Sequence, residues 1–108
     1  MSYRIVIQPR ALDNLRAQYR YIAAQSPGIA DRWFNRFVAA IESLAQHPQR
    51  CPLARESAQL GREIRQLLFG KRGGVRRIYF AIVGDEVHVL CVRHAAQADI
   101  TAEDLLDE

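Results

Sequence analysis

The stretch GREIRQLLFGKRGGVRRIYFAIVGDEVHVLCVRH, residues 61–94, decides the fold of this chain. Three strands are predicted, over residues 63–69, 75–83 and 86–94. The first and third alternate apolar with polar side chains, and the second is rich in β-branched and aromatic ones. Gly84 and Asp85 link the second strand to the third, and glycine at the first position of a two-residue link favours a type II′ turn. The stretch is therefore predicted to form an antiparallel meander.

The third of these strands is predicted to have two regular faces, because side chains alternate along a strand. One face carries Val87, Val89, Cys91 and Arg93, and the other carries His88, Leu90, Val92 and His94. Tyr79, in the middle of the central strand, is predicted to lie in the core.

The same stretch concentrates positive charge. Its cations before the end of the central strand are Arg62, Arg65, Lys71, Arg72, Arg76 and Arg77. Within this part of the chain they are opposed only by Glu63, and Arg93 and His94 end the last strand. A sheet of this kind either binds a polyanion or is covered by an acidic partner.

Charge is distributed unevenly along the whole chain. The last ten residues contain five acids and no base, so residues 1–98 carry fifteen basic and seven acidic side chains, a net charge of about +8. Fourteen of the fifteen cations are arginines, whose planar guanidinium groups bind phosphates and carboxylates through paired hydrogen bonds. A GC-rich genome would produce the same preference for arginine.

The remaining elements are predicted from apolar spacing and from prolines. Residues 3–8 form a short strand that ends at Pro9. Residues 10–25 and 29–46 have apolar side chains at helical spacing and are separated by Ser26-Pro27-Gly28, which predicts two antiparallel helices. Residues 49–60 are predicted to be a loop. A capping box from Thr101 to Asp104 predicts a short terminal helix that continues through Leu105 and Leu106.

The resulting order is β-α-α-β-β-β-α. We expect one domain spanning residues 1–108, of the α+β class, with a helical hairpin packed on a mainly antiparallel four-stranded sheet. No apolar run approaches the ~20 residues that cross a membrane. The N-terminus lacks the pattern of a signal peptide, so we expect a cytoplasmic protein. Cys51 and Cys91 lack the spacing of metal ligands and are interpreted as small buried hydrophobic residues; no metal site and no cofactor are expected.

This order of elements resembles the RelE/ParE superfamily of bacterial toxins from type II toxin–antitoxin modules. The resemblance covers nearly the whole chain. It rests on the strand that ends in a proline and on four motifs: Leu44-Ala-Gln-His-Pro48, Ile64-Arg-Gln-Leu67, Val75-Arg-Arg-Ile-Tyr-Phe80 and Val92-Arg-His94. It implies a growth-inhibiting toxin that stabilises plasmids. It also implies a cognate antitoxin as partner, in a toxin–antitoxin hetero-oligomer.

The superfamily contains two activities. RelE-like members are endoribonucleases that cleave messenger RNA on the ribosome, whereas ParE-like members inhibit DNA gyrase without enzymatic activity. The RelE-like hypothesis assigns catalysis to Arg65, Arg76, Arg93 and His94, with the arginines as a phosphate clamp and His94 as a group that titrates near neutral pH. The tail after His94 lacks the aromatic residue often found in RelE-like toxins.

The ParE-like hypothesis is favoured by the long helices and by the absence of that catalytic tail. Independently of this choice, the candidates for contact with the target or with nucleic acid are Arg62, Lys71, Arg72 and Arg77. A third alternative is an inactive module that only binds its antitoxin. Three of the residues predicted to be catalytic have structural roles as alternatives. His94 could bond to the backbone, and Arg76 and Arg93 could pair with Glu63 or with the C-terminal acids.

Overall fold

The computed structural model describes residues 2–71 and 74–105. Its elements are β1 (Arg4–Ile7), α1 (Pro9–Gln25), α2 (Pro27–Glu42), η1 (Ser43–Ala45), η2 (Pro48–Arg50), α3 (Ser57–Leu60), β2 (Arg65–Phe69), β3 (Arg76–Val83), β4 (Glu86–His94) and η4 (Ala102–Leu105), where η denotes a 3-10 helix. The predicted α+β fold is confirmed. The predicted loop over residues 49–60 contains η2 and the short helix α3, and Leu106 lies outside the described residues.

The four strands form one sheet in the order β1-β4-β3-β2. β1 is parallel to β4, whereas β4, β3 and β2 are antiparallel neighbours. The predicted hairpin between β3 and β4 is present: Gly84 has φ 61° and Asp85 does not have positive φ, as a type II′ turn requires.

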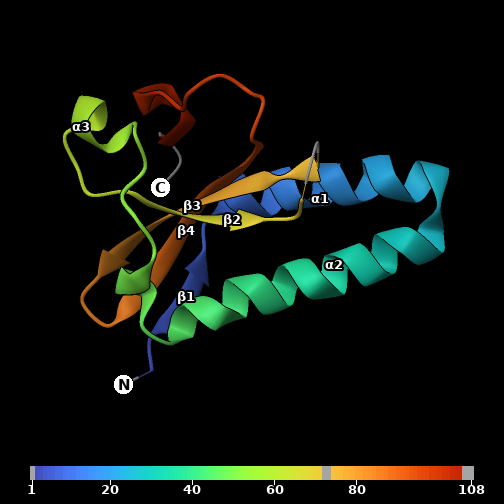
Figure 1. Ribbon diagram of the computed structural model, residues 1–108, viewed down its shortest axis with the longest axis horizontal. Coiled ribbons are helices and arrows are strands. Elements are labelled where there is room, and N and C mark those ends of the chain that lie inside the picture. Colours follow the sequence, from blue (N-terminus) through green and yellow to red (C-terminus); the bar gives the residue numbers. More distant parts are fainter. Residues whose placement is uncertain (1, 72–73, 106–108) are drawn as a thin grey trace.

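The helical hairpin α1–α2 covers one face of the sheet and extends beyond it at the tip (Figure 1). Its apolar side packs against the sheet in a core that includes Leu15, Phe37, Ile41, Ile78, Phe80, Val87, Val89 and Val92. Pro9 and Pro27 each occupy the first turn of their helix, where a missing N–H costs nothing. We call the face under the hairpin the helix face.

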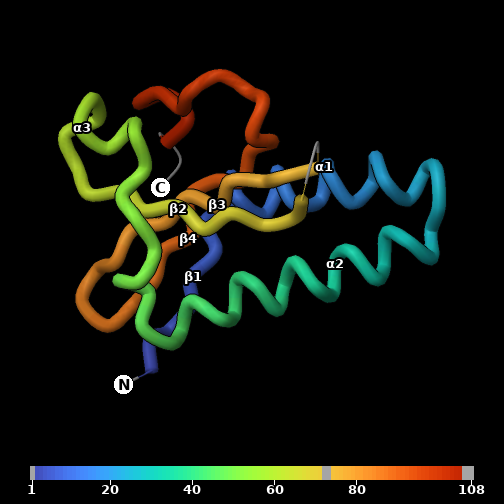
Figure 2. The backbone as a smooth tube through the Cα atoms, viewed as in Figure 1, coloured from blue at the N-terminus to red at the C-terminus, as the bar shows by residue number. Residues whose placement is uncertain are grey.

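The opposite face of the sheet, called here the far face, is covered by α3 and by the C-terminal segment. Figure 2 shows these two segments together on the side away from α2. The second core lies beneath them and contains Ala54, Ile64, Tyr79, Ala81, Leu90, Cys91 and Ile100. Tyr79 is fully buried, as predicted, and both cysteines are buried and unpaired.

The predicted faces of β4 are wrong from Cys91 onward, because the pairing of β3 with β4 contains a β-bulge. Tyr79 pairs with Cys91 and Phe80 pairs with Val89, so Leu90 is the additional residue. Leu90 and Cys91 both enter the far-face core, and the following residues exchange faces. Arg93 therefore lies on the far face, whereas Val92 and His94 lie on the helix face.

Candidate functional site

The basic residues at the ends of β3 and β4 are divided between the two faces. Arg76 pairs with His94 on the helix face, and Arg77 pairs with Arg93 on the far face. Arg65 shares the helix face with Arg76, but it pairs with Phe80 at the other end of β2. Arg76 pairs with Phe69, four positions along β2 from Arg65, which corresponds to a distance of about 13 Å. The four residues predicted to be catalytic are therefore not brought together.

Arg65 contacts the loop before α3. Its Nη1 donates to the carbonyl oxygen of Cys51 at 2.7 Å and lies 3.5 Å from that of Gln49. These bonds fix the segment that runs beside the edge of β2, where Gln66 N–H also donates to Pro52. Arg65 has a structural role that the sequence pattern did not indicate.

Arg77 is buried on the far face with only 3% of its surface exposed. Its Nη1 and Nη2 donate to the two carboxylate oxygens of Glu56 at 2.9 and 2.7 Å, and Nε donates to Gln66 at 2.8 Å. The prediction that Arg77 contacts a target is wrong, because the guanidinium is enclosed and neutralised. Its acidic partner, Glu56, lies in the segment predicted to be a loop and not in the basic strands.

Glu56 is the acceptor for several donors around it. Tyr79 Oη donates to Oε2 at 2.7 Å, and the backbone N–H of Ile100 donates to the same oxygen at 3.2 Å. Burial alone would raise the pKa of the Glu56 carboxyl, but these donors and Arg77 outweigh it and lower the pKa to about 2. Burial and the bond to Glu56 raise the pKa of Tyr79. The network joins the loop, β3 and the C-terminal segment.

Arg93 is held by the C-terminal segment. Its Nη2 donates to the carbonyl oxygen of Ala98 at 3.0 Å, and its Nη1 lies 3.6 Å from Asp104. The predicted alternative, contact with the C-terminal acids, is confirmed for Arg93. Arg77 and Arg93 would repel each other across the strands, and Glu56 and Asp104 offset that repulsion.

One half of the predicted capping box is present. The Thr101 N–H donates to the Asp104 carboxylate at 2.8 Å, whereas the Asp104 N–H donates to the carbonyl oxygen of Thr101 and not to its hydroxyl.

Arg76 lies in a groove between the helical hairpin and the ends of β2 and β3. We call it the Trp33 groove; it has a volume of about 490 Å³ and is lined by Ile22, Trp33, Arg36, Phe69, Gly70, Lys71, Gly74 and Arg76. The Arg76 guanidinium stands over the Trp33 ring, 5.7 Å from its centre. Its Nε donates to Gln18 at 3.0 Å and its Nη1 to the carbonyl oxygen of Gly74 at 2.7 Å. Trp33 and Arg36 lie on α2, where the apolar spacing indicates a helix that packs on the sheet and no motif indicates a site.

His94 is the cross-strand partner of Arg76 and therefore lies next to this groove. Its backbone N–H donates to Gln97 at 2.7 Å, and its Nδ1 accepts from the backbone N–H of Ala96 at 3.0 Å. The predicted alternative, in which His94 bonds to the backbone, is confirmed.

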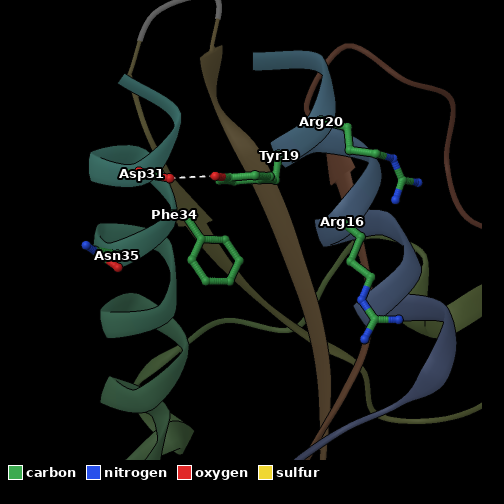
Figure 3. Close-up of a pocket in the computed structure, with 6 residues that line it drawn as sticks. All are labelled: Arg16, Tyr19, Arg20, Asp31, Phe34 and Asn35. Carbon is green, nitrogen blue, oxygen red and sulfur yellow. Dashed lines mark hydrogen bonds between the residues drawn. The ribbon is translucent and has the colours of Figure 1, made fainter. Parts of the chain in front are cut away.

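A second cavity lies between α1 and α2, on the side shown in Figure 3. It has a volume of about 470 Å³ and is lined by Arg16, Tyr19, Arg20, Asp31, Phe34 and Asn35. Tyr19 Oη donates to Asp31 at 2.5 Å, and its ring stands edge-on to Phe34 with centres 5.6 Å apart. Asp31, the acid of this cavity, is therefore bonded to Tyr19, and the side chains of Arg16 and Arg20 are exposed.

Of the other cations predicted to contact a target, Arg62 and Lys71 are exposed. Arg72 lies outside the described residues.

The described part of the chain contains no group of three or more side chains arranged to hold a metal ion. Burial raises the pKa of the Cys91 thiol to about 12 and also raises that of Cys51, so neither is a nucleophile near neutral pH. Within the described ranges, the helices are too short or too polar to cross a membrane.

Comparison with known proteins agrees with this architecture. Among solved structures, the chain is similar to one from the chromosomal ParDE toxin–antitoxin system of P. aeruginosa, with a TM-score of 0.67 and 20% sequence identity. The match covers 86% of this chain and 96% of that chain, and at this identity it concerns the fold. No curated protein sequence matches significantly. The model of the family described as "ParE toxin of type II toxin-antitoxin system, parDE" matches residues 5–99. The chain therefore belongs to the ParE toxin family.

Proposed function

We propose that this protein is the toxin of a type II toxin–antitoxin pair, that it inhibits DNA gyrase in the cytoplasm, and that a cognate antitoxin neutralises it in a hetero-oligomer. The observation that carries the proposal is the match to the ParE toxin family over residues 5–99. The solved relative, a chain of a ParDE toxin–antitoxin system, supports an antitoxin partner.

The placement of the cations supports inhibition by binding over catalysis. Cleavage of RNA needs a base, an acid and cations around one phosphate. Here Arg65 bonds to a loop, and Arg93 lies on the opposite face from Arg76 and His94. Inhibition of an enzyme by binding needs only a complementary surface, and the exposed Arg62 and Lys71 are the cations proposed to contact the target. Arg72 is proposed for the same role from sequence alone.

The proposal is tested in cells by inducing the toxin gene and following plasmid topology and growth. Inhibition of gyrase lowers negative supercoiling, so relaxed plasmid should accumulate before growth stops, and co-expression of the antitoxin should reverse both effects. Arrested growth with unchanged plasmid topology would contradict gyrase as the target. Normal growth, with a toxin that still binds its antitoxin, would indicate an inactive antitoxin-binding module.

A second candidate function is RelE-like cleavage of messenger RNA on the ribosome. One observation favours it: Arg76 and His94 are direct cross-strand partners on one face, so a cation and a titratable ring lie together. A translation extract distinguishes the candidates, because only the ribonuclease would shorten messenger RNA when the purified toxin is added.

A further inference from the structure

We infer that the cavity between α1 and α2 binds a guanine mononucleotide, with the phosphate against α1 and the edge of the base against α2. This cavity, called here the hairpin cavity, has a volume of about 470 Å³ and is the one shown in Figure 3. It shares no lining residue with the Trp33 groove. A ligand in it would be recognised separately from the target of the toxin.

The α1 wall of the hairpin cavity is cationic. Arg16 and Arg20 are four residues apart and therefore lie on one side of the helix, where two like charges destabilise it. Both side chains are exposed, and in the part of the chain that the structure describes no carboxylate pairs with either of them. A phosphate would relieve the repulsion and would accept the paired hydrogen bonds that guanidinium groups donate.

The α2 wall provides hydrogen-bond acceptors. Asp31 accepts from Tyr19 Oη through Oδ1 at 2.5 Å, and this bond raises the pKa of Tyr19, so the hydroxyl keeps its proton. A carboxylate has about four acceptor positions, and Asp31 is exposed, so positions remain for a ligand. Asp31 does not pair with the arginines of the same cavity, so the two walls present opposite charges that a ligand can bridge.

These acceptors favour guanine among the bases. The edge of guanine presents two adjacent N–H donors, on the ring and on the exocyclic amino group, which match the two oxygens of a carboxylate. Adenine presents an acceptor nitrogen next to its amino group, so one of the two bonds to Asp31 would be replaced by repulsion. Asn35 also lines the cavity, and its amide can donate to the carbonyl oxygen of guanine.

Aromatic rings lie between the two walls. Tyr19 and Phe34 stand edge-on, with ring centres 5.6 Å apart and planes inclined by 78°. Both are only half-buried, and Figure 3 shows the Phe34 ring between the helices, so a flat base can lie against it. The volume of the cavity falls in the range of about 300–1,000 Å³ that small-molecule sites occupy. Phosphate, sugar and base of one nucleotide can therefore span the cavity.

A protein segment fits the hairpin cavity less well, because a protein interface has an apolar centre. The exposed large hydrophobic side chains of the described residues are Ile7, Tyr21, Ile29, Leu53, Leu68 and Val83, and none of them lines this cavity. The apolar surface here is limited to two half-buried rings between charged walls. It suits a small ligand with one anionic end and one donor end.

The test uses isothermal titration calorimetry of the full-length toxin with GMP, guanosine, AMP and inorganic phosphate. The cavity variant is Arg16→Gln with Arg20→Gln. The control variant is Arg32→Gln with Arg36→Gln, which removes the same charge at the same spacing from α2 without changing a residue that lines the cavity. All four arginines are exposed, and circular dichroism verifies that both variants fold.

The wild type should bind GMP with a Kd between about 1 and 100 µM, the affinity of a ligand of this size at ordinary efficiency. The cavity variant should bind GMP about tenfold more weakly and should no longer distinguish GMP from guanosine, because both lack a phosphate contact there. The control variant should change by less than about threefold. Asp31→Asn should reduce the affinity for GMP to that for AMP, because an amide offers only one acceptor oxygen.

Folded wild-type toxin that binds no GMP at about 1 mM would overturn the inference, as would equal losses in the two arginine variants or equal affinities for GMP and AMP. Inorganic phosphate that displaces GMP at equal concentration would show a site for anions alone. A guanine-containing single-stranded RNA that binds more tightly than GMP, and loses this affinity in the cavity variant, would identify nucleic acid as the occupant instead. None of these outcomes affects gyrase inhibition, which is measured without added nucleotide monophosphate.

Discussion

Arg77 and Glu56 form a buried ion pair in which Nη1 and Nη2 of the arginine meet the two oxygens of the carboxylate at 2.9 and 2.7 Å. Arg77 comes from the central strand β3 and Glu56 from the turn before α3. Glu56 also accepts from Ile100, so this single carboxylate joins three distant segments of the chain. Arg77, which was predicted to contact the target, therefore has a structural role.

Glu56→Gln should destabilise the protein by about 3–5 kcal/mol, because the amide leaves the buried Arg77 without a counter-charge. Urea unfolding followed by circular dichroism measures the loss. The matched control is Arg55→Gln, which removes an exposed ion pair with Asp99 and should leave the unfolding midpoint unchanged. Equal effects of the two substitutions would show that the buried pair is not a principal source of stability.

Stability should decrease in acid within a window set by Glu56. The folded state lowers the pKa of this carboxyl from 4.5 to about 2, so its contribution is complete above about pH 4.5 and is lost as the pH falls to about 2. Urea midpoints measured across this range for the wild type and for Glu56→Gln test the expectation. The difference between them should shrink toward pH 2, and a constant difference would contradict it.

Ile100→Ala should cost about 2–4 kcal/mol, since the Ile100 side chain is buried in the far-face core and its removal leaves a cavity. Leu53→Ala is the control, because that side chain is 47% exposed and its loss should be small. Urea unfolding measures both variants. An Ile100→Ala protein as stable as the wild type would mean that the C-terminal segment does not pack on the sheet in solution.

His94→Ala should leave growth inhibition intact, because the ring accepts a backbone bond in the turn after β4 and Arg93 lies on the other face. Growth after induction in cells measures this, with the amount of toxin checked by immunoblot. Toxicity lost in His94→Ala, and equally in the folded Arg76→Ala, His94→Ala double variant, would favour the ribonuclease candidate.

The elements of the fold were predictable from local pattern, because prolines, helical spacing and strand alternation act over a few residues. Pro9 and Pro27 begin the two helices, and Gly84 forms the predicted turn. The family resemblance followed from the order of these elements, and the family match confirms it.

The arrangement of the site was less predictable, because it depends on one residue of register and on contacts between distant segments. The bulge at Leu90 moves Arg93 to the opposite face from the one predicted, and nothing in the alternation of β4 indicates it. Glu56 lies 21 residues before Arg77 and outside the strands, so the charge pattern of the strands does not indicate the pair. The one available signal was the single acid in residues 49–60, a segment without apolar periodicity.

A DNA gyrase supercoiling assay with purified toxin, performed with and without its antitoxin, is the most direct measurement of the proposed function. The folded toxin should block the supercoiling of relaxed plasmid, and the antitoxin added in equal amount should restore it. Undiminished supercoiling in the presence of a folded protein that arrests growth in cells would contradict gyrase inhibition and direct attention to messenger RNA on the ribosome.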